Sequence, residues 1–132
     1  MSSILQKQIG VTTANINVVG INETVVAYTG RCEATLPTMR AIVRGWIQFQ
    51  QGTGGTGFVV RIRRGNGLVG NQINPSATIT LPAGNQLDSS YIIAETVSNV
   101  EYVDYTLSVS SPGASGNSTV LGGSIEVELI NG

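Results

Sequence analysis

Two glutamates near the carboxyl end of the chain, Glu126 and Glu128, are spaced as a pair of catalytic carboxylates could be. They lie two residues apart in the alternating segment 124–130, so their side chains share one face of a strand. A glycoside hydrolase uses two such carboxylates on either side of the bond that it cleaves. Each glutamate has a simpler role as a solvated charge or an arginine partner, and the sequence contains no histidine, the usual general base. We therefore predict that the protein is not an enzyme and has no catalytic residues.

The loop 52–57, Gly-Thr-Gly-Gly-Thr-Gly, matches the glycine pattern of dinucleotide-binding loops. Such a loop places phosphates at the N-terminus of a helix, whereas the alternating residues 58–64 indicate a strand. The single cysteine, Cys32, cannot form an internal disulfide, and no histidine is present to complete a zinc site with it. We therefore expect no cofactor and no metal, an exposed mobile hairpin loop at 52–57, and a buried, inert thiol.

Trp46 lies between Arg44 and Gln48 on the polar face of the alternating segment 40–50. An exposed indole beside polar side chains can stack on a sugar ring, as in carbohydrate-binding sandwiches. Tryptophan and arginine are also enriched in protein interfaces, where they carry much of the binding energy. Both functions remain open from the residues alone, and we favour the interface.

Alternation of apolar and polar residues divides most of the chain into eight strands. The predicted strands are residues 14–19, 24–36, 40–50, 58–64, 77–81, 90–97, 102–110 and 124–130. Before them, we expect only a short turn over residues 4–9, capped by Ser3 and closed by Gly10. Many short strands without a helix favour an all-β fold, an antiparallel eight-stranded jelly-roll β-sandwich. An immunoglobulin-like sandwich is the alternative, although its second cysteine is missing. We assign residues 1–20 to an N-terminal arm or strand and residues 21–132 to the sandwich.

Charge is scarce and segregated along the sequence. Charged residues make up 11% of the chain and the formal net charge is −1, so no overall field attracts nucleic acid or an anionic membrane. Residues 34–87 contain five arginines and no acid, whereas residues 88–132 contain six acids and no base. This segregation predicts that the two halves pair, within one sandwich or between copies. No secretory signal or long apolar run is visible, so we expect synthesis in a cytoplasm.

Jelly-roll connectivity fixes which strands become neighbours. One sheet is expected to contain, in spatial order, residues 14–19, 124–130, 40–50 and 90–97, and the other 24–36, 102–110, 58–64 and 77–81. In the first sheet, Arg44 should lie near Glu126 or Glu128 on the adjacent strand. In the second sheet, Arg61 or Arg63 should lie near Asp104.

The outer face of the first sheet is expected to carry an apolar patch. Its predicted members are Trp46, Tyr91, Ile93 and Ile130, with Tyr91 and Ile93 facing outward so that Glu95 avoids the core. Low charge content and a patch without cover indicate self-association. We predict a homo-oligomer interface formed by this patch together with Arg44, Glu126 and Glu128, and anchored by Trp46.

Three stretches of the sequence, residues 45–70, 78–87 and 105–130, carry a family resemblance. They contain a strand-turn-strand ending in Arg-Ile-Arg-Arg-Gly, an Ala-Gly-Asn turn, and Tyr-Thr-Leu-Ser-Val before a Gly/Ser-rich loop. These elements resemble the small tumour-necrosis-factor-like jelly-roll proteins of tailed bacteriophages, which trimerise in virions.

The resemblance implies a virion structural protein of the capsid cement or decoration type. Such a protein binds the major capsid protein on the outer capsid surface as a homotrimer, and the resembling trimers pack through the sheet that would carry Trp46. The alternative is a carbohydrate- or receptor-binding module of a phage spike or fibre.

Overall fold

A computed structural model of the chain describes residues 4–19 and 21–131, and this part of the chain contains strands, turns and loops but no helix. Accordingly, none of the described residues form a helix that is long and apolar enough to cross a membrane. The strands are β1 Ile4–Thr12, β2 Ile16–Val19, β3 Thr24–Tyr28, β4 Cys32–Glu33, β5 Thr38–Gln50, β6 Gly57–Arg64, β7 Thr78–Thr80, β8 Gln86–Ser98, β9 Tyr102–Val103, β10 Tyr105–Ser110 and β11 Asn117–Asn131.

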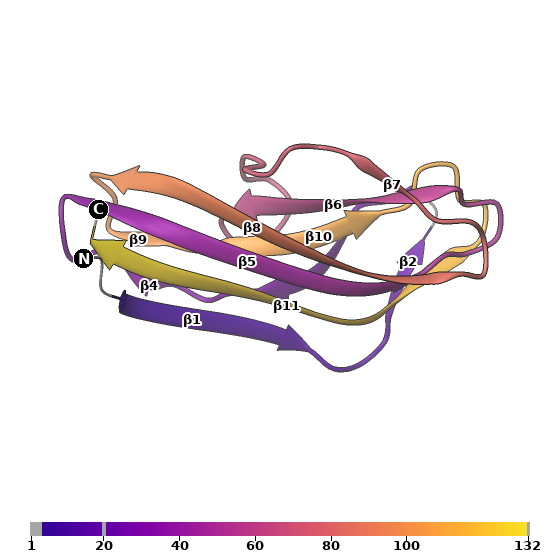
Figure 1. The fold of residues 1–132 in the computed structure, drawn as a ribbon, viewed down its shortest axis with the longest axis horizontal. Coiled ribbons are helices and arrows are strands. Elements are labelled where there is room, and N and C mark those ends of the chain that lie inside the picture. Colours follow the sequence, from indigo (N-terminus) through magenta and orange to yellow (C-terminus); the bar gives the residue numbers. More distant parts are fainter. Residues whose placement is uncertain (1–3, 20, 132) are drawn as a thin grey trace.

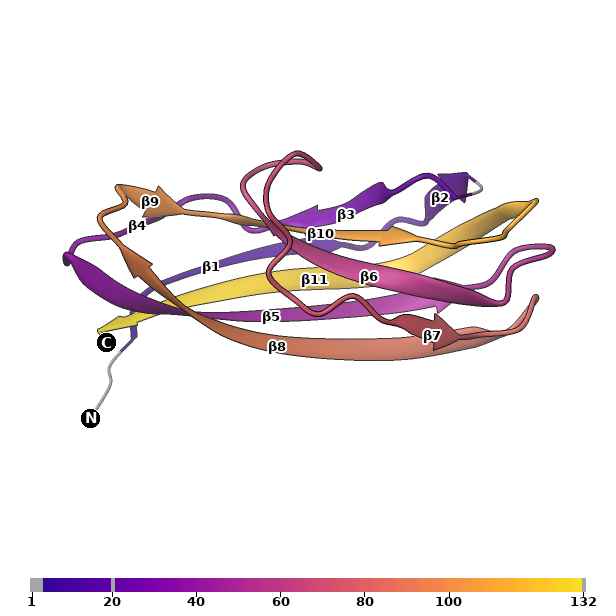
Figure 2. The same ribbon diagram turned by 90° about the horizontal axis from the view of Figure 1, so that it is seen from above.

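The strands form two layers that face each other along the length of the molecule (Figure 1 and Figure 2). One sheet has the order β1-β11-β5-β8, with β2 paired to the other end of β11, and the second has the order β3-β10-β6-β7. The short strands β4 and β9 pair separately. All pairings are antiparallel. The predicted all-β antiparallel sandwich is therefore confirmed.

The second sheet has the predicted strand order, but the first has it only in part, because β1 takes the place beside residues 123–130 and the predicted strand 14–19 pairs, as β2, with residues 117–120. The number of strands also differs. The described residues form eleven strands instead of eight. The predicted strand 24–36 is divided into β3 and β4, because Gly30 adopts a φ of 80° that a regular strand does not allow. The predicted strand 102–110 is likewise divided at Asp104.

Side chains from the inner faces of both sheets form one core. Phe49 of β5 and Phe58 of β6 lie on either side of the hairpin loop, and their ring centroids are 4.6 Å apart. Other fully buried side chains in the core include Met39, Ile47, Ile62, Tyr105, Leu107, Ile125 and Leu129. Each such side chain contributes about 1.5–3 kcal/mol by its removal from water. The alternation of apolar and polar residues in the long strands directs these side chains inward, and their burial holds the two sheets together.

The N-terminal segment forms a strand and not the expected turn. Residues 4–12 form β1, which pairs with β11, while the predicted cap Ser3 lies outside the described residues. Gly10 does not close a turn. It allows β1 to cross close to β3, since a Cβ atom at position 10 would lie 1.9 Å from the carbonyl oxygen of Tyr28. The Thr12 hydroxyl donates a hydrogen bond to the carbonyl of Val26 nearby. The two sheets therefore meet along a seam between β1 and β3.

The hairpin loop 52–57 is exposed at Thr53, Gly54 and Thr56 as expected, but it packs against the loop between β10 and β11 and is not an unattached tip. The carbonyl of Thr53 accepts hydrogen bonds from the amides of Ser115 and Gly116, each at 3.0 Å. Gly55 is buried, and the amide of Gly52 donates to the hydroxyl of Ser118. Gln51 Nε2 and the Ser111 hydroxyl, both buried, also donate hydrogen bonds to the carbonyl of Gly57. The backbone of the loop is therefore held by groups that lie outside it.

Candidate functional site

The outer face of the sheet β1-β11-β5-β8, which points away from the core, carries five of the seven residues predicted to form an interface: Arg44, Trp46, Glu126, Glu128 and Ile130. Its register places outward side chains in rows that cross four strands. One row contains Ile9, Glu126, Arg44 and Ile92, and the next contains Val11, Ser124, Trp46 and Ser90. The aliphatic side chains at the two ends of the first row are exposed to solvent, with exposed fractions of 53% for Ile9 and 64% for Ile92.

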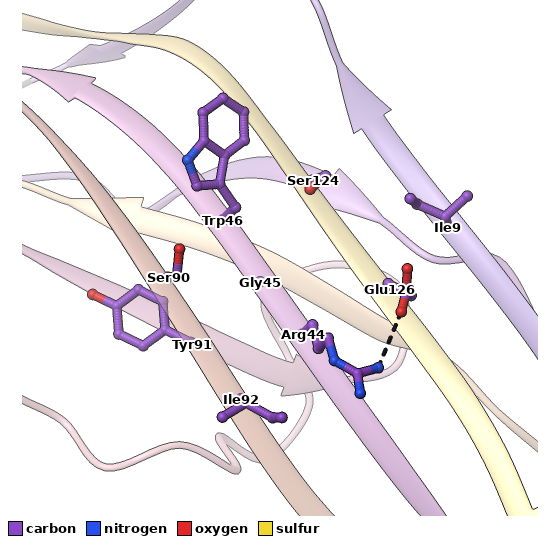
Figure 3. A pocket seen from close by; sticks show the side chains of 9 residues that line it. All are labelled: Ile9, Arg44, Gly45, Trp46, Ser90, Tyr91, Ile92, Ser124 and Glu126. Carbon is purple, nitrogen blue, oxygen red and sulfur yellow. Dashed lines mark hydrogen bonds and ion pairs between the residues drawn. The ribbon is translucent and has the colours of Figure 1, made fainter.

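A shallow hollow of about 350 Å³ lies on this outer face, and Figure 3 shows the side chains around it. Its lining residues are Ile9, Arg44, Gly45, Trp46, Ser90, Tyr91, Ile92, Ser124 and Glu126. Arg44 and Trp46 both point outward from β5, on either side of the inward position Gly45. The residues around the hollow provide an indole, a phenol, aliphatic groups, two serine hydroxyls and an ion pair.

The indole of Trp46 is half-buried because it lies against Gly122 of β11. A Cβ atom at position 122 would lie 3.3 Å from Cη2 of the indole and 3.4 Å from Cζ3. Those distances are close to the limit of van der Waals contact, so glycine at this position allows the ring to approach the backbone of β11 closely. The position of Trp46 is thus set by the sheet beneath it before any partner binds.

Four charged side chains form a connected group on the outer face. Nη1 of Arg44 lies 3.1 Å from Oε1 of Glu126 and 3.1 Å from Oε1 of Glu128. Nζ of Lys7 lies 3.2 Å from Glu126 and 3.8 Å from Glu128. The predicted contact between Arg44 and these glutamates is confirmed, and both carboxylates are already occupied by cations. Partial burial raises the pKa of Glu126, but hydrogen bonds from Lys7 and Arg44 outweigh this effect and hold it below its usual value.

Two of the predicted interface residues, Tyr91 and Ile93, face the core and not the outer face. In the register of β5 with β8, Ile93 lies opposite the fully buried Val43, and both Tyr91 and Ile93 pack against the core. Tyr91 reaches the hollow only at its wall (Figure 3). Ile92, which lies between them, is the outward residue.

The prediction for β8 was wrong because Glu95 tolerates an inward position. Its carboxylate accepts hydrogen bonds from Nε and Nη2 of Arg64, at 3.0 and 2.9 Å, and from the hydroxyl of Tyr105 at 2.5 Å. Arg64 and Tyr105 belong to the second sheet, so Glu95 links the two layers at their edge. The negative charge of Glu95 is therefore compensated by Arg64 and does not need full exposure to water. Burial, together with the hydrogen bond to Glu95, raises the pKa of Tyr105.

Ile130 lies on the outer face as predicted, but its neighbour on β5 is Arg40, several residues from the hollow. The prediction missed Ile9, Val11 and Ile92. Lys7, Ile9 and Val11 alternate with the inward Gly10 in β1, and this period of two would have indicated a strand had the segment not been interpreted as a turn.

The predicted pairing of Arg61 or Arg63 with Asp104 is wrong. Arg63 binds Glu23 through two contacts, Nε to Oε2 at 2.7 Å and Nη2 to Oε1 at 2.8 Å. Nη1 of Arg61 donates to the hydroxyl of Ser110, and Asp104 accepts a hydrogen bond from Tyr28 at 2.6 Å. Burial, together with the hydrogen bond to Asp104, raises the pKa of Tyr28 to about 12. The basic segment 34–87 and the acidic segment 88–132 therefore pair only in part, because Arg63 of the basic segment binds Glu23, which lies outside the acidic segment.

The pair between Glu23 and Arg63 predicts a pH dependence of stability. The hydrogen bond from Arg63 is the main reason that the pKa of Glu23 lies below its usual value near 4.5; burial opposes it and Ser108 reinforces it. A lowered pKa in the folded state stabilises the protein above the unfolded pKa, and this contribution is lost as the pH falls through the folded pKa.

The wild type should lose stability as the pH falls from 7 to 3. Over the same range we expect the free energy of unfolding of Glu23→Gln to fall by about 1 kcal/mol less than that of the wild type. Urea unfolding at a series of pH values measures this difference. Asp88→Asn, which neutralises an exposed carboxylate on β8, is the matched control. An acid profile of Glu23→Gln that is identical to the wild type would contradict the assignment.

Cys32 is fully buried, and burial raises the pKa of its thiol. Among the described residues, no group of three or more His, Cys, Asp and Glu side chains is arranged to hold a metal ion.

No protein-family model and no curated protein matches the sequence. Solved structures of infectious bursal disease virus contain chains with a similar fold. For the structure of the Gx strain the TM-score is 0.58 at 15% identity, over 98% of this chain and 33% of that chain. For the T13 viral particle the TM-score is 0.54 at 11% identity, over 97% of this chain and 35% of that chain.

A chain in the structure of the Gt strain has a TM-score of 0.51 at 15% identity, over 96% of this chain and 32% of that chain. The protein spans about a third of the length of these viral chains. Similarity at such low identity establishes a shared fold and not a shared activity. The chain is an all-β antiparallel sandwich with the fold of a segment found in chains of virus particles.

Proposed function

We propose that the protein is a structural component of a virion, which binds the outer surface of a capsid as a homotrimer in the manner of cement or decoration proteins. The observation that carries this proposal is the outer face around Trp46. It has a preformed hollow with aliphatic walls, and no other segment of the described chain covers it. The likeness to chains of virus particles supports a role in assembly.

The order of strands in the two sheets supports a jelly roll of the tumour-necrosis-factor type found in tailed bacteriophages. In this proposal residues 21–132 form the jelly roll, and the N-terminal residues 1–20 form an arm that adds strands to β11.

The proposed trimer contact is centred on the hollow. Trp46 is its anchor, and Ile9 and Ile92 supply apolar area on either side. Arg44, Glu126 and Glu128 contribute a group that Lys7 brings to zero net charge, so copies that approach through this face do not repel each other. Ile130 extends the face along β11. The other partner in the proposal is the major capsid protein.

Purified protein added to virus particles that lack it tests the proposal. We expect the particles to bind the protein in multiples of three, as mass measurement of intact particles would show. We also expect bound particles to release their genome at a higher temperature than bare ones, because the added interface must be broken first. Particles that neither bind the protein nor become more stable would contradict a cement role.

A carbohydrate- or receptor-binding module of a spike or fibre is the second candidate. The observation that favours it is the chemical mixture in the hollow, where the indole of Trp46 lies near the hydroxyls of Ser90 and Ser124 (Figure 3). Aromatic rings stack on the apolar faces of sugars while hydroxyls bond to their edges. Glycan-array binding that is lost in Trp46→Ala and kept in Ile130→Ala would favour this function.

A further inference from the structure

The strand β8 forms a long free edge of the sandwich. It contains 13 residues and pairs with β5 alone, without a shift in register from Thr38↔Ser98 to Gln50↔Gln86. On its other side, none of the described residues forms a backbone hydrogen bond with it. A regular unpaired edge of this length presents a row of amide and carbonyl groups to any strand that approaches.

Proteins usually protect such edges, and two other edges of this sandwich are closed or short. β1 is closed against β3 at Gly10, and β7 has only three residues. Proline, lysine and bulges are common protective devices, and β8 has none of them. Its inward carboxylate, Glu95, is held by Arg64 and Tyr105. The edge is therefore available for pairing.

We propose that β8 pairs antiparallel with β8 of a second copy of this chain, around a two-fold axis at Ile92. Ile92 is the midpoint of Gln86–Ser98, so pairing centred there uses every residue of the strand. The two sheets then join into one continuous sheet across the contact, with both outer faces on the same side.

The side chains of β8 match each other in this register. Residues directly opposite in an antiparallel pair point to the same face, so an outward residue must meet an outward residue, as Ile92 meets Ile92. On the inward side Tyr91 lies opposite Ile93. The two carboxylates lie opposite hydroxyls: Asp88 opposite Thr96, and Glu95 opposite Ser89.

Moving the two-fold axis by one residue also places outward residues opposite outward residues, but the side chains then pair less favourably. A two-fold axis at Tyr91 places Glu95 opposite Leu87, and one at Ile93 places Glu95 opposite Tyr91. Each of these registers also leaves two residues of β8 without a partner. The complementarity of β8 with itself, and not its exposure alone, is what identifies a second copy as the partner.

This contact goes beyond the proposed trimer and does not depend on it. The trimer uses the outer face around Trp46, whereas the two-fold contact uses the backbone edge of β8. If both form, the two-fold contacts link one trimer to the next, which would extend an assembly over a surface.

Single cysteines on β8 test the register. Ile92→Cys brings two thiols opposite each other across the axis, where Cα atoms are about 4.5–5.5 Å apart, within the range of a disulfide. Ser90→Cys alone and Ala94→Cys alone place equivalent thiols about 14 Å apart along the strand, but a mixture of the two variants brings them opposite each other. The native thiol, Cys32, is fully buried and does not compete.

Under mild oxidation of the folded full-length protein, we expect Ile92→Cys to lose its monomer band to a covalent dimer. Ser90→Cys and Ala94→Cys should stay monomeric on the gel when alone and form the dimer when mixed. The same dimer should form when Trp46→Ala is added to Ile92→Cys, which separates this contact from the proposed trimer. Absence of the Ile92 dimer, or equal cross-linking of all three single variants, would overturn the proposal.

Discussion

Replacing Gly10 with alanine is expected to lower the free energy of unfolding by about 3 kcal/mol. The added Cβ atom would lie 1.9 Å from the carbonyl oxygen of Tyr28 and 2.7 Å from its carbonyl carbon. Both are backbone atoms of β3, so the clash cannot be relieved by rotation of a side chain. The seam between β1 and β3 must open instead, and urea unfolding measures the cost.

Gly45→Ala is the matched control for this prediction. Gly45 is also an inward glycine in a long strand, but its added Cβ atom would meet only the flexible ends of Leu107 and Ile62, at 3.2 and 3.4 Å. We expect a loss of about 1 kcal/mol there. If Gly10→Ala is as stable as the wild type, β1 does not cross β3 as closely as the structure has it.

Replacing Trp46 with alanine is expected to weaken self-association by about 2 kcal/mol per contact, or roughly 30-fold in the dissociation constant. The indole is half-buried and held in place by Gly122, so little conformational entropy is lost when a partner covers its exposed side. Sedimentation equilibrium over a range of protein concentrations measures the change.

Ile130→Ala, on the same outer face but away from the hollow, is the control for Trp46→Ala and should weaken association much less, because contacts at the edge of an interface contribute little of its binding energy. Monomer stability is measured in parallel, since the contact of the indole with Gly122 contributes to the sheet itself. If Trp46→Ala assembles with the affinity of the wild type, the hollow is not at the centre of the interface.

The sequence alone was sufficient for the main architecture. Residues 40–50 and 124–130 alternate so regularly that only one face of each segment can be buried. With that constraint and jelly-roll connectivity, the neighbours of the strands in the second sheet and the order β11-β5-β8 in the first could be predicted, and Arg44 was correctly placed beside Glu126 and Glu128. These features depend on the two-residue period within each strand and on the order of the strands along the chain, and the sequence contains both.

The sequence did not determine which face of β8 is buried, because apolar residues 91–94 fit either choice. The inward choice was decided by Arg64 and Tyr105, residues distant in the chain that neutralise Glu95. The N-terminal strand and the packed loop 52–57 depend in the same way on distant backbone groups, in β11 and in residues 115–116. A polar group can occupy a buried position when its partner is present, and only the tertiary structure brings those partners together.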